Sequence, residues 1–187
     1  MKEHNRGMTM VEVLAITLIV TIVIVLLVPF FVRAKERKRR AQCANNLKQL
    51  GLGIAQYYDE QNPNSMPPMN SVSALFTSIA PYVVSIQQLA VCPSDKTTPV
   101  AATVADLTRS SYAWTIYQVW ANVRMYPMMF DRLGTGNTTA TATSHWSKTG
   151  SSHIDGGNVL FSDGHVAWHE VFPMGDTGVV SYPLVND

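Results

Sequence analysis

The stretch GMTMVEVLAITLIVTIVIVLLVPFFV, residues 7–32, decides the fold. Its only ionisable side chain is that of Glu12, so residues 13–32 carry no charge. As a helix rising about 1.5 Å per residue, a segment of this length covers roughly 30 Å, the thickness of the hydrocarbon core of a bilayer. We therefore predict a transmembrane helix near the start of the chain.

This segment differs from a cleavable secretory signal. A secretory signal has a shorter apolar core, and small residues at a cleavage site follow that core. Here the apolar core is followed by a basic run, RAKERKRR at 33–40. We expect the helix to stay on the mature protein and any cleavage to fall before it.

Glu12 is the unusual residue of the segment. A carboxylate so close to the start of a membrane span is costly and normally has a partner. The simpler alternative places Glu12 at the headgroup boundary or in the first helical turn, where the helix dipole favours negative charge.

Gly7, Met8 and Glu12, in G-M-T-M-V-E, resemble the type IV prepilin signal G-F-T-L-x-E. The resemblance implies that a prepilin peptidase cuts after Gly7 and that Met8 becomes the methylated N-terminus. It also implies an assembly role for Glu12, as the counter-ion of a neighbouring subunit's N-terminus. Pro29 matches a position where many pilins carry a helix-loosening proline. Met8 departs from the phenylalanine usual at its position.

Three further segments are similar to those of major-pseudopilin-like proteins with a C-terminal H-x9-DG motif. They are C-x-N-N-L-K-Q-L-G at 43–51, C-P-S-D at 92–95, and the H-x9-DG motif formed by His153, Asp163 and Gly164. The resemblance implies an α+β, type IV pilin-like fold, in which a long N-terminal helix packs on a small antiparallel sheet.

Four parts are expected along the chain: a leader (1–7), a membrane helix (8–32), its basic and then amphipathic continuation (33–58), and a globular head (59–187). Between residues 41 and 58, apolar residues recur at three- and four-residue intervals, which predicts one buried helix face. Gly51 and Gly53 weaken this helix, although close packing against a sheet could offset the cost.

The sequence of the head predicts short helices and strands separated by turns. We expect a proline-rich loop at 59–70, a short helix within 71–84, an exposed loop at 134–150, and strands at 111–120, 122–129, 158–161 and 165–172. Asp163-Gly164 favours a two-residue hairpin turn, because both positions tolerate positive φ.

Charge is distributed unevenly along the chain. Residues 1–40 hold eight Lys/Arg and three Glu, whereas the remainder holds six basic and ten acidic residues. The positive-inside rule alone would keep the head in the cytoplasm. The prepilin resemblance implies the opposite orientation, so the basic run would face solvent or lipid headgroups. An acidic body without an aromatic-basic patch argues against nucleic-acid binding.

Cys43 and Cys92 are the only cysteines. Outside the cytoplasm, they could form one disulfide bond between helix and head. Alternatively, both are small, reduced core residues. Two cysteines alone are too few for a structural zinc site, which usually has four ligands.

Histidines and aspartates are concentrated near the C-terminus. His153 could order the hairpin through a hydrogen bond to Asp163, or the region could hold a metal. Asp155, Asp163 and Asp176 are candidate oxygen donors for calcium, which some major pseudopilins bind in a C-terminal loop, but they lack the spacing of an EF-hand. No other cofactor is expected.

The sequence contains no H-E-x-x-H, G-x-S-x-G or phosphate-binding glycine loop, and Asp131 and Glu170 read as surface carboxylates rather than an acid–base pair. We therefore expect no enzyme, but a structural subunit of a type IV pilus or type II secretion pseudopilus. It would begin as a single-pass inner-membrane protein with its head outside the cytoplasm and end in a periplasmic or cell-surface filament. Its partners would be other pilin-like subunits, a prepilin peptidase, the inner-membrane assembly platform and membrane lipids.

The alternative function is a membrane-tethered module whose head binds an extracellular ligand, either a carbohydrate or a metal. Tryptophan side chains would supply stacking surfaces for a sugar, although core packing is the more common use of such residues. The four tryptophans are Trp114, Trp120, Trp146 and Trp168.

Overall fold

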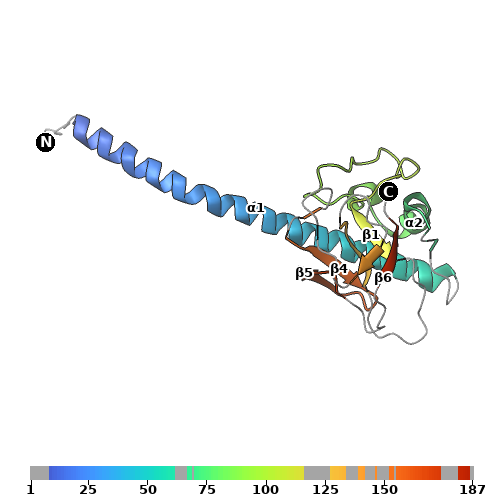
Figure 1. Cartoon of the computed structure of the whole chain (residues 1–187). Helices are drawn as coiled ribbons and strands as arrows, with labels where there is room; N and C mark the ends of the chain where they lie inside the picture. Colours follow the sequence, from blue (N-terminus) through green and yellow to red (C-terminus); the bar gives the residue numbers. More distant parts are fainter. Residues whose placement is uncertain are drawn as a thin grey trace. The chain divides into compact units, whose positions relative to one another are not determined.

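The computed structural model describes residues 9–61, 67–68, 70–115, 127–133, 139–141, 146, 152–153, 155–173 and 181–185, with the backbone alone for 139–141 and 181–185. The chain divides into two compact units, residues 1–38 and 39–187. Helix α1 (Met10–Gln61) contributes its apolar N-terminal part to the first unit and its C-terminal part to the second (Figure 1). Within the described residues, the first unit consists of Thr9 and the part of α1 that ends at Lys38.

The second unit, the head, is built on an antiparallel sheet. Its strands run in the order β3-β6-β1-β2-β4-β5, and every pair of neighbours is antiparallel. The strands are β1 (Tyr112–Thr115), β2 (Pro127–Asp131), β3 (Thr139–Thr141), β4 (Gly157–Phe161), β5 (Val166–His169) and β6 (Ser181–Val185). This arrangement of a long helix and a small antiparallel sheet confirms the predicted α+β fold.

The C-terminal part of α1 packs against one face of the sheet. Its buried residues are Cys43, Leu47, Leu50, Gly53 and Ile54, at the three- and four-residue intervals that the sequence predicts. They share a core with Tyr112 and Trp114 of β1, Met129 of β2 and Leu160 of β4.

Successive residues of the central strands point to opposite faces, as strand geometry requires. Ala113, Phe130, Val159 and Phe161 therefore leave the helix side and form a second core with Trp146 and Phe172. Both faces of the central strands are covered, which explains why β1, β2 and β4 are buried along their whole length.

Two short helices complete the described head. Helix α2 (Val72–Ile79) begins where Ser71 accepts a hydrogen bond from Ala74 N–H at 3.2 Å, and helix α3 (Ile86–Leu89) follows a 3-10 turn at Ala80–Tyr82. The short helix predicted within 71–84 is therefore confirmed, and Pro81 lies beyond its end, in the 3-10 turn. Phe76 of α2 packs edge-on against Trp114, with ring centroids 6.1 Å apart.

The predicted strands need three corrections. Strand β2 extends to Asp131, two residues beyond the expected 122–129 strand. Strand β3 lies within the stretch 134–150 that was expected to be a loop, and Trp146 in the same stretch is buried. Strand β6, which pairs with both β1 and β3, was not expected.

The β4–β5 hairpin has a longer turn than predicted. Gly164 N–H donates to Phe161 O, and Phe161 N–H donates to His165 O, both at 2.9 Å. Gly164 has φ 86°, whereas Asp163 is not among the described residues with positive φ. The turn therefore contains residues 162–164, with glycine in the left-handed position that this hairpin type requires.

Candidate functional site

Helix α1 begins with a reciprocal capping arrangement. Thr9 N–H donates to Glu12 Oε2 at 2.9 Å, and Glu12 N–H donates to Thr9 Oγ1 at 3.3 Å. Each side chain thus satisfies a backbone donor that the helix leaves unpaired at its start. The T-x-x-E spacing of Thr9 and Glu12 in the sequence signals this capping box. The predicted cleavage residues Gly7 and Met8 lie outside the described residues.

The apolar part of α1 presents hydrophobic side chains on every side. The large apolar side chains from Met10 to Val32 are exposed, each by at least 46%. This helix is long and apolar enough to cross a membrane. The helix continues through Pro29 without a break in its bounds.

The basic run changes character along its length. Arg33, Lys35, Arg37 and Lys38 are exposed, as expected for side chains facing solvent or headgroups. Arg40 is partly buried: its guanidinium carbon lies 4.2 Å from the ring centroid of Trp168, and Nη2 lies 3.6 Å from Asp155 Oδ2. The expectation of a wholly solvated run is therefore wrong for Arg40, because the β5 tryptophan covers it.

Cys43 and Cys92 form a disulfide bond with Cα atoms 5.1 Å apart. Both residues are fully buried. The bond joins α1 to the segment that follows α3, so it holds the helix to the head. Such a bond is typical of a domain outside the cytoplasm.

His153, the first residue of H-x9-DG, lies beside this disulfide. Its Nε2 is 3.5 Å from Cys92 Sγ and 3.5 Å from Asp131 Oδ2. Its ring also packs edge-on against Trp168, with centroids 5.4 Å apart. The predicted hydrogen bond from His153 to Asp163 is wrong, since the described polar contacts of Asp163 are with His165.

Asp131 is the residue that sequence reasoning misplaced. Its carboxylate is fully buried rather than at the surface. Oδ2 accepts hydrogen bonds from Asn158 N–H at 2.7 Å and from Asn158 Nδ2 at 2.8 Å. Burial raises the pKa of Asp131 to about 6, although nearby His153 and the Asn158 hydrogen bonds lower it in part. Glu170, its imagined partner, is exposed.

Asp163 and Gly164, the end of the H-x9-DG motif, shape the hairpin turn. Asp163 Oδ1 accepts from His165 N–H at 3.0 Å and lies 2.6 Å from His165 Nδ1. The backbone hydrogen bond from His165 is the largest cause of a pKa of Asp163 below its usual value. Of the calcium candidates, Asp155 thus contacts Arg40 and Asp163 contacts His165. Asp176 lies outside the described residues.

The C-P-S-D motif supplies a second buried carboxylate. Asp95 Oδ2 lies 2.9 Å from Arg132 Nη2 and accepts from Ser111 Oγ at 2.8 Å. Burial, the largest influence, raises the pKa of Asp95, but hydrogen bonds from Thr97, Thr98 and Ser111 outweigh it and leave the pKa lowered. This network ties the loop after Cys92 to the strand end at Asp131.

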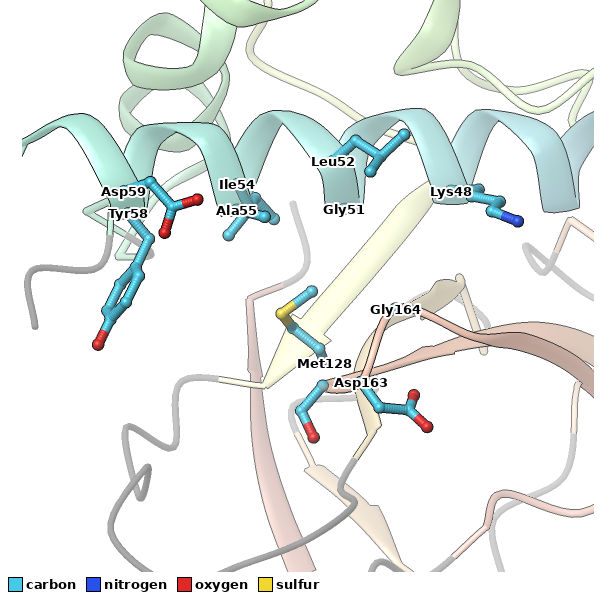
Figure 2. A pocket seen from close by; sticks show the side chains of 11 residues that line it. Lys48, Gly51, Leu52, Ile54, Ala55, Tyr58, Asp59, Met128, Asp163 and Gly164 are labelled. Carbon is cyan, nitrogen blue, oxygen red and sulfur yellow. The ribbon is translucent and has the colours of Figure 1, made fainter. Parts of the chain in front are cut away.

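A groove of about 280 Å³ lies between α1 and the hairpin turn. Figure 2 shows Leu52 and Tyr58 on the helix across from Met128 of β2 and the turn at Gly164. Most of the lining is apolar, with charged groups contributed by Lys48, Asp59 and Asp163. The full lining is Lys48, Gly51, Leu52, Ile54, Ala55, Tyr58, Asp59, Met128, Ser162, Asp163 and Gly164.

A family model described as a protein of unknown function, DUF1559, matches residues 32–87, which include the basic run, the head part of α1 and helix α2. No curated protein and no solved structure shows a significant match to the chain. The chain thus carries a segment similar to DUF1559, in a fold where a long apolar N-terminal helix is followed by a small antiparallel sheet.

Proposed function

We propose that the chain is the membrane precursor of a pilin-like subunit, processed after Gly7, which polymerises through the apolar part of α1 into a type IV pilus or a type II secretion pseudopilus. The observation that carries the proposal is an apolar helix, exposed on all sides, that begins at a single carboxylate and continues into a small, disulfide-bonded head.

The exposed apolar surface supports polymerisation. So large an apolar surface is stable only in lipid or against other apolar helices. The helix of an ordinary membrane anchor contacts lipid alone. In a polymerising subunit, contacts with lipid are replaced by contacts with the same helix of other copies. The exposed side chains from Met10 to Val32 suit both environments.

Glu12 gives the proposed polymer its register. Cleavage after Gly7 would create an ammonium group on Met8, and this charge needs a counter-ion once it is surrounded by apolar helices. Removing one partner of such a buried pair costs roughly 3–5 kcal/mol, since the other charge is left uncompensated. The capping contact with Thr9 keeps the Glu12 carboxylate at the helix start, near the place where a neighbour's N-terminus would meet it.

Glu12→Ala tests the proposal. We expect filament incorporation, measured as subunits in the sheared filament fraction, to fall at least about tenfold because roughly 3–5 kcal/mol of pairing is lost. Glu60→Ala, an exposed glutamate near the other end of the same helix, is the matched control and should incorporate normally. Equal incorporation of both variants, at equal membrane levels, would contradict assembly through Glu12.

Intact mass and N-terminal sequencing of protein from its native membrane test the processing step. A chain that begins at methylated Met8 is the expected result. A chain that retains residues 1–7, or one cut after the apolar segment, would exclude prepilin processing.

A second candidate function is ligand binding by the tethered head, which the groove favours. The sugar-stacking version loses support at three of its four tryptophans, since Trp114 and Trp146 are buried and Arg40 covers Trp168. Trp120 lies outside the described residues. An apolar ligand with one charged group fits the groove lining better. Thermal shifts of the full chain with aromatic carboxylates and amines test it: a shift lost in Ala55→Trp but kept in Glu12→Ala would favour binding over assembly.

A further inference from the structure

Four side chains that bind metals in other proteins meet inside the head. One ligand atom each from Cys43, Cys92, Asp131 and His153 lies within 4.8 Å of the others, and all four residues are buried. They come from α1, the segment after α3, the end of β2 and the H-x9-DG motif. Segments far apart in the sequence therefore bring two sulfurs, an imidazole nitrogen and a carboxylate to one point.

The carboxylate in this cluster is incompletely paired. Among the described residues, Asp131 Oδ1 has no hydrogen-bond partner, although its side chain is fully buried. A buried polar atom without a partner is costly, and in a native structure it calls for an explanation such as a bound ion. The oxygen belongs to the same carboxyl group that lies 3.5 Å from His153 Nε2.

Two distances within the cluster fit the edges of a tetrahedral metal site. Zinc bonds of about 2.3 Å to sulfur and 2.0–2.2 Å to nitrogen or oxygen give edges of roughly 3.3–3.6 Å between unlike ligand atoms. His153 Nε2 lies 3.5 Å from both Cys92 Sγ and Asp131 Oδ2. The edge between the two sulfurs is too short, because a covalent bond joins them. Once reduced, the two sulfurs need to separate to roughly 3.8 Å.

We propose that, when the disulfide is reduced, the head binds one Zn²⁺ through the Cys43 and Cys92 thiolates, His153 Nε2 and an Asp131 carboxylate oxygen. A dithiol reductant supplies the two electrons and two protons that split the S–S bond, and it becomes a disulfide itself. Zinc then displaces the two thiol protons. Two thiolates select zinc over the hard cations calcium and magnesium.

The disulfide and the metal exclude each other, since both use the same two sulfurs. The bond holds α1 to the head in an oxidising environment, and the metal would hold the same elements together in a reducing one. This role is independent of polymerisation, so either proposal can fail without the other.

Cobalt binding by the full chain in detergent tests the site. The chain is unfolded, reduced with an excess of a phosphine, and refolded without oxygen in the presence of Co²⁺. We expect one Co²⁺ per chain, with the visible absorption of tetrahedral cobalt and a thiolate charge-transfer band, both removed by one equivalent of Zn²⁺. The chain with its disulfide intact should bind none. A reduced chain that takes up no Co²⁺, whether folded or not, overturns the proposal.

Ligand variants separate this site from binding by two thiols alone. Loss of an outer-sphere partner typically weakens metal binding roughly 10- to 100-fold. Because His153 and Asp131 would bind the metal directly, His153→Ala and Asp131→Asn should each weaken cobalt binding by at least this much. His165→Ala, which removes an exposed histidine of the hairpin, is the control and should bind as the parent does. Circular dichroism of each variant in its disulfide form shows whether it can fold. Undiminished binding by folded His153→Ala and Asp131→Asn chains would overturn the proposal.

Discussion

Asp131 makes the stability of the head depend on pH in an unusual direction. Burial raises the pKa of this carboxyl from 3.8 to about 6, and His153 and Asn158 only partly oppose the rise. Between these values the folded chain binds more protons than the unfolded chain, so the contribution of Asp131 to the free energy of unfolding falls as pH rises. Two pKa units correspond to roughly 3 kcal/mol, lost between about pH 4 and pH 6 and constant above.

Urea unfolding of the parent and of Asp131→Asn at several pH values checks this. The difference between their free energies of unfolding should shift by roughly 3 kcal/mol, in favour of the variant, as pH rises from about 4 to 7. Using the difference removes the contribution of Asp95, whose lowered pKa acts in the opposite direction. Asp59→Asn, at an exposed site on α1, should show no such shift. If the free energies of unfolding of Asp131→Asn and the parent changed with pH in parallel, the raised pKa of Asp131 would be contradicted.

The disulfide between Cys43 and Cys92 should contribute strongly to stability. Its two ends are 49 residues apart in the sequence, and closing a loop of that length lowers the entropy of the unfolded chain by an amount worth about 4 kcal/mol. We expect Cys43→Ser to lower the free energy of urea unfolding by about this much under oxidising, metal-free conditions. Adding Cys92→Ser should cost little more, since the bond is already absent. If the two substitutions lowered the free energy of unfolding additively, the loss would come from side-chain packing rather than from the disulfide bond.

The sequence identifies His153 through its motif but gives no partner for it. Its nearest carboxylates in the sequence, Asp155 and Asp163, do not form its described contacts, which are with Cys92 and Asp131. Those partners meet because strand β2 ends beside the loop that carries Cys92, a tertiary arrangement that no local pattern encodes. The burial of Asp131 was unpredictable for the same reason.

At the scale of elements, the two glycines of α1 allow close packing. A Cβ on Gly53 would overlap the Val83 side chain, whereas one on Gly51 would lie 2.8 Å from the flexible end of Leu160. Alanine favours a helix over glycine by up to about 1 kcal/mol, but forcing an atom into a packed core costs roughly 1–3 kcal/mol. We expect Gly53→Ala to destabilise the head.

Gly51→Ala is the matched comparison for this prediction, because the same atom is added two residues away on the same helix. Its effect on the urea midpoint should be smaller than that of Gly53→Ala, since the Leu160 methyl groups can move aside. If Gly53→Ala raised the midpoint, helix propensity would outweigh the overlap with Val83.

Elements with a strong periodic pattern could be predicted, and those without one could not. The buried face of α1 and strands β4 and β5 follow from apolar spacing and from the Asp163-Gly164 turn. Strand β3, in a Thr-rich stretch, and β6, which contains Pro183, lie toward one edge of the sheet. Backbone pairing defines them more than any alternation of side chains, so the sequence carries little signal for them.

At the scale of the whole molecule, two physical rules predict opposite orientations of the chain in the membrane. The exposed cations after the span favour a cytoplasmic head by the positive-inside rule. The buried disulfide favours a head outside the cytoplasm. We expect protease added to spheroplasts to remove a C-terminal epitope tag without permeabilisation. A cytoplasmic marker must survive the same treatment. A tag lost only after permeabilisation would place the head inside.

The bond between Cys43 and Cys92 also determines how tension passes through the subunit. A pull on the N-terminal part of α1 reaches Cys43 and then crosses directly to Cys92, so the chain between them carries no load. That shielded segment spans 49 residues and would extend by roughly 170 Å if it were stretched. An oxidised subunit under force can therefore lengthen only before Cys43 or beyond Cys92. The bond passes the load from α1 to the segment that leads into β1, and it keeps the end of α1 and helices α2 and α3 out of the loaded path.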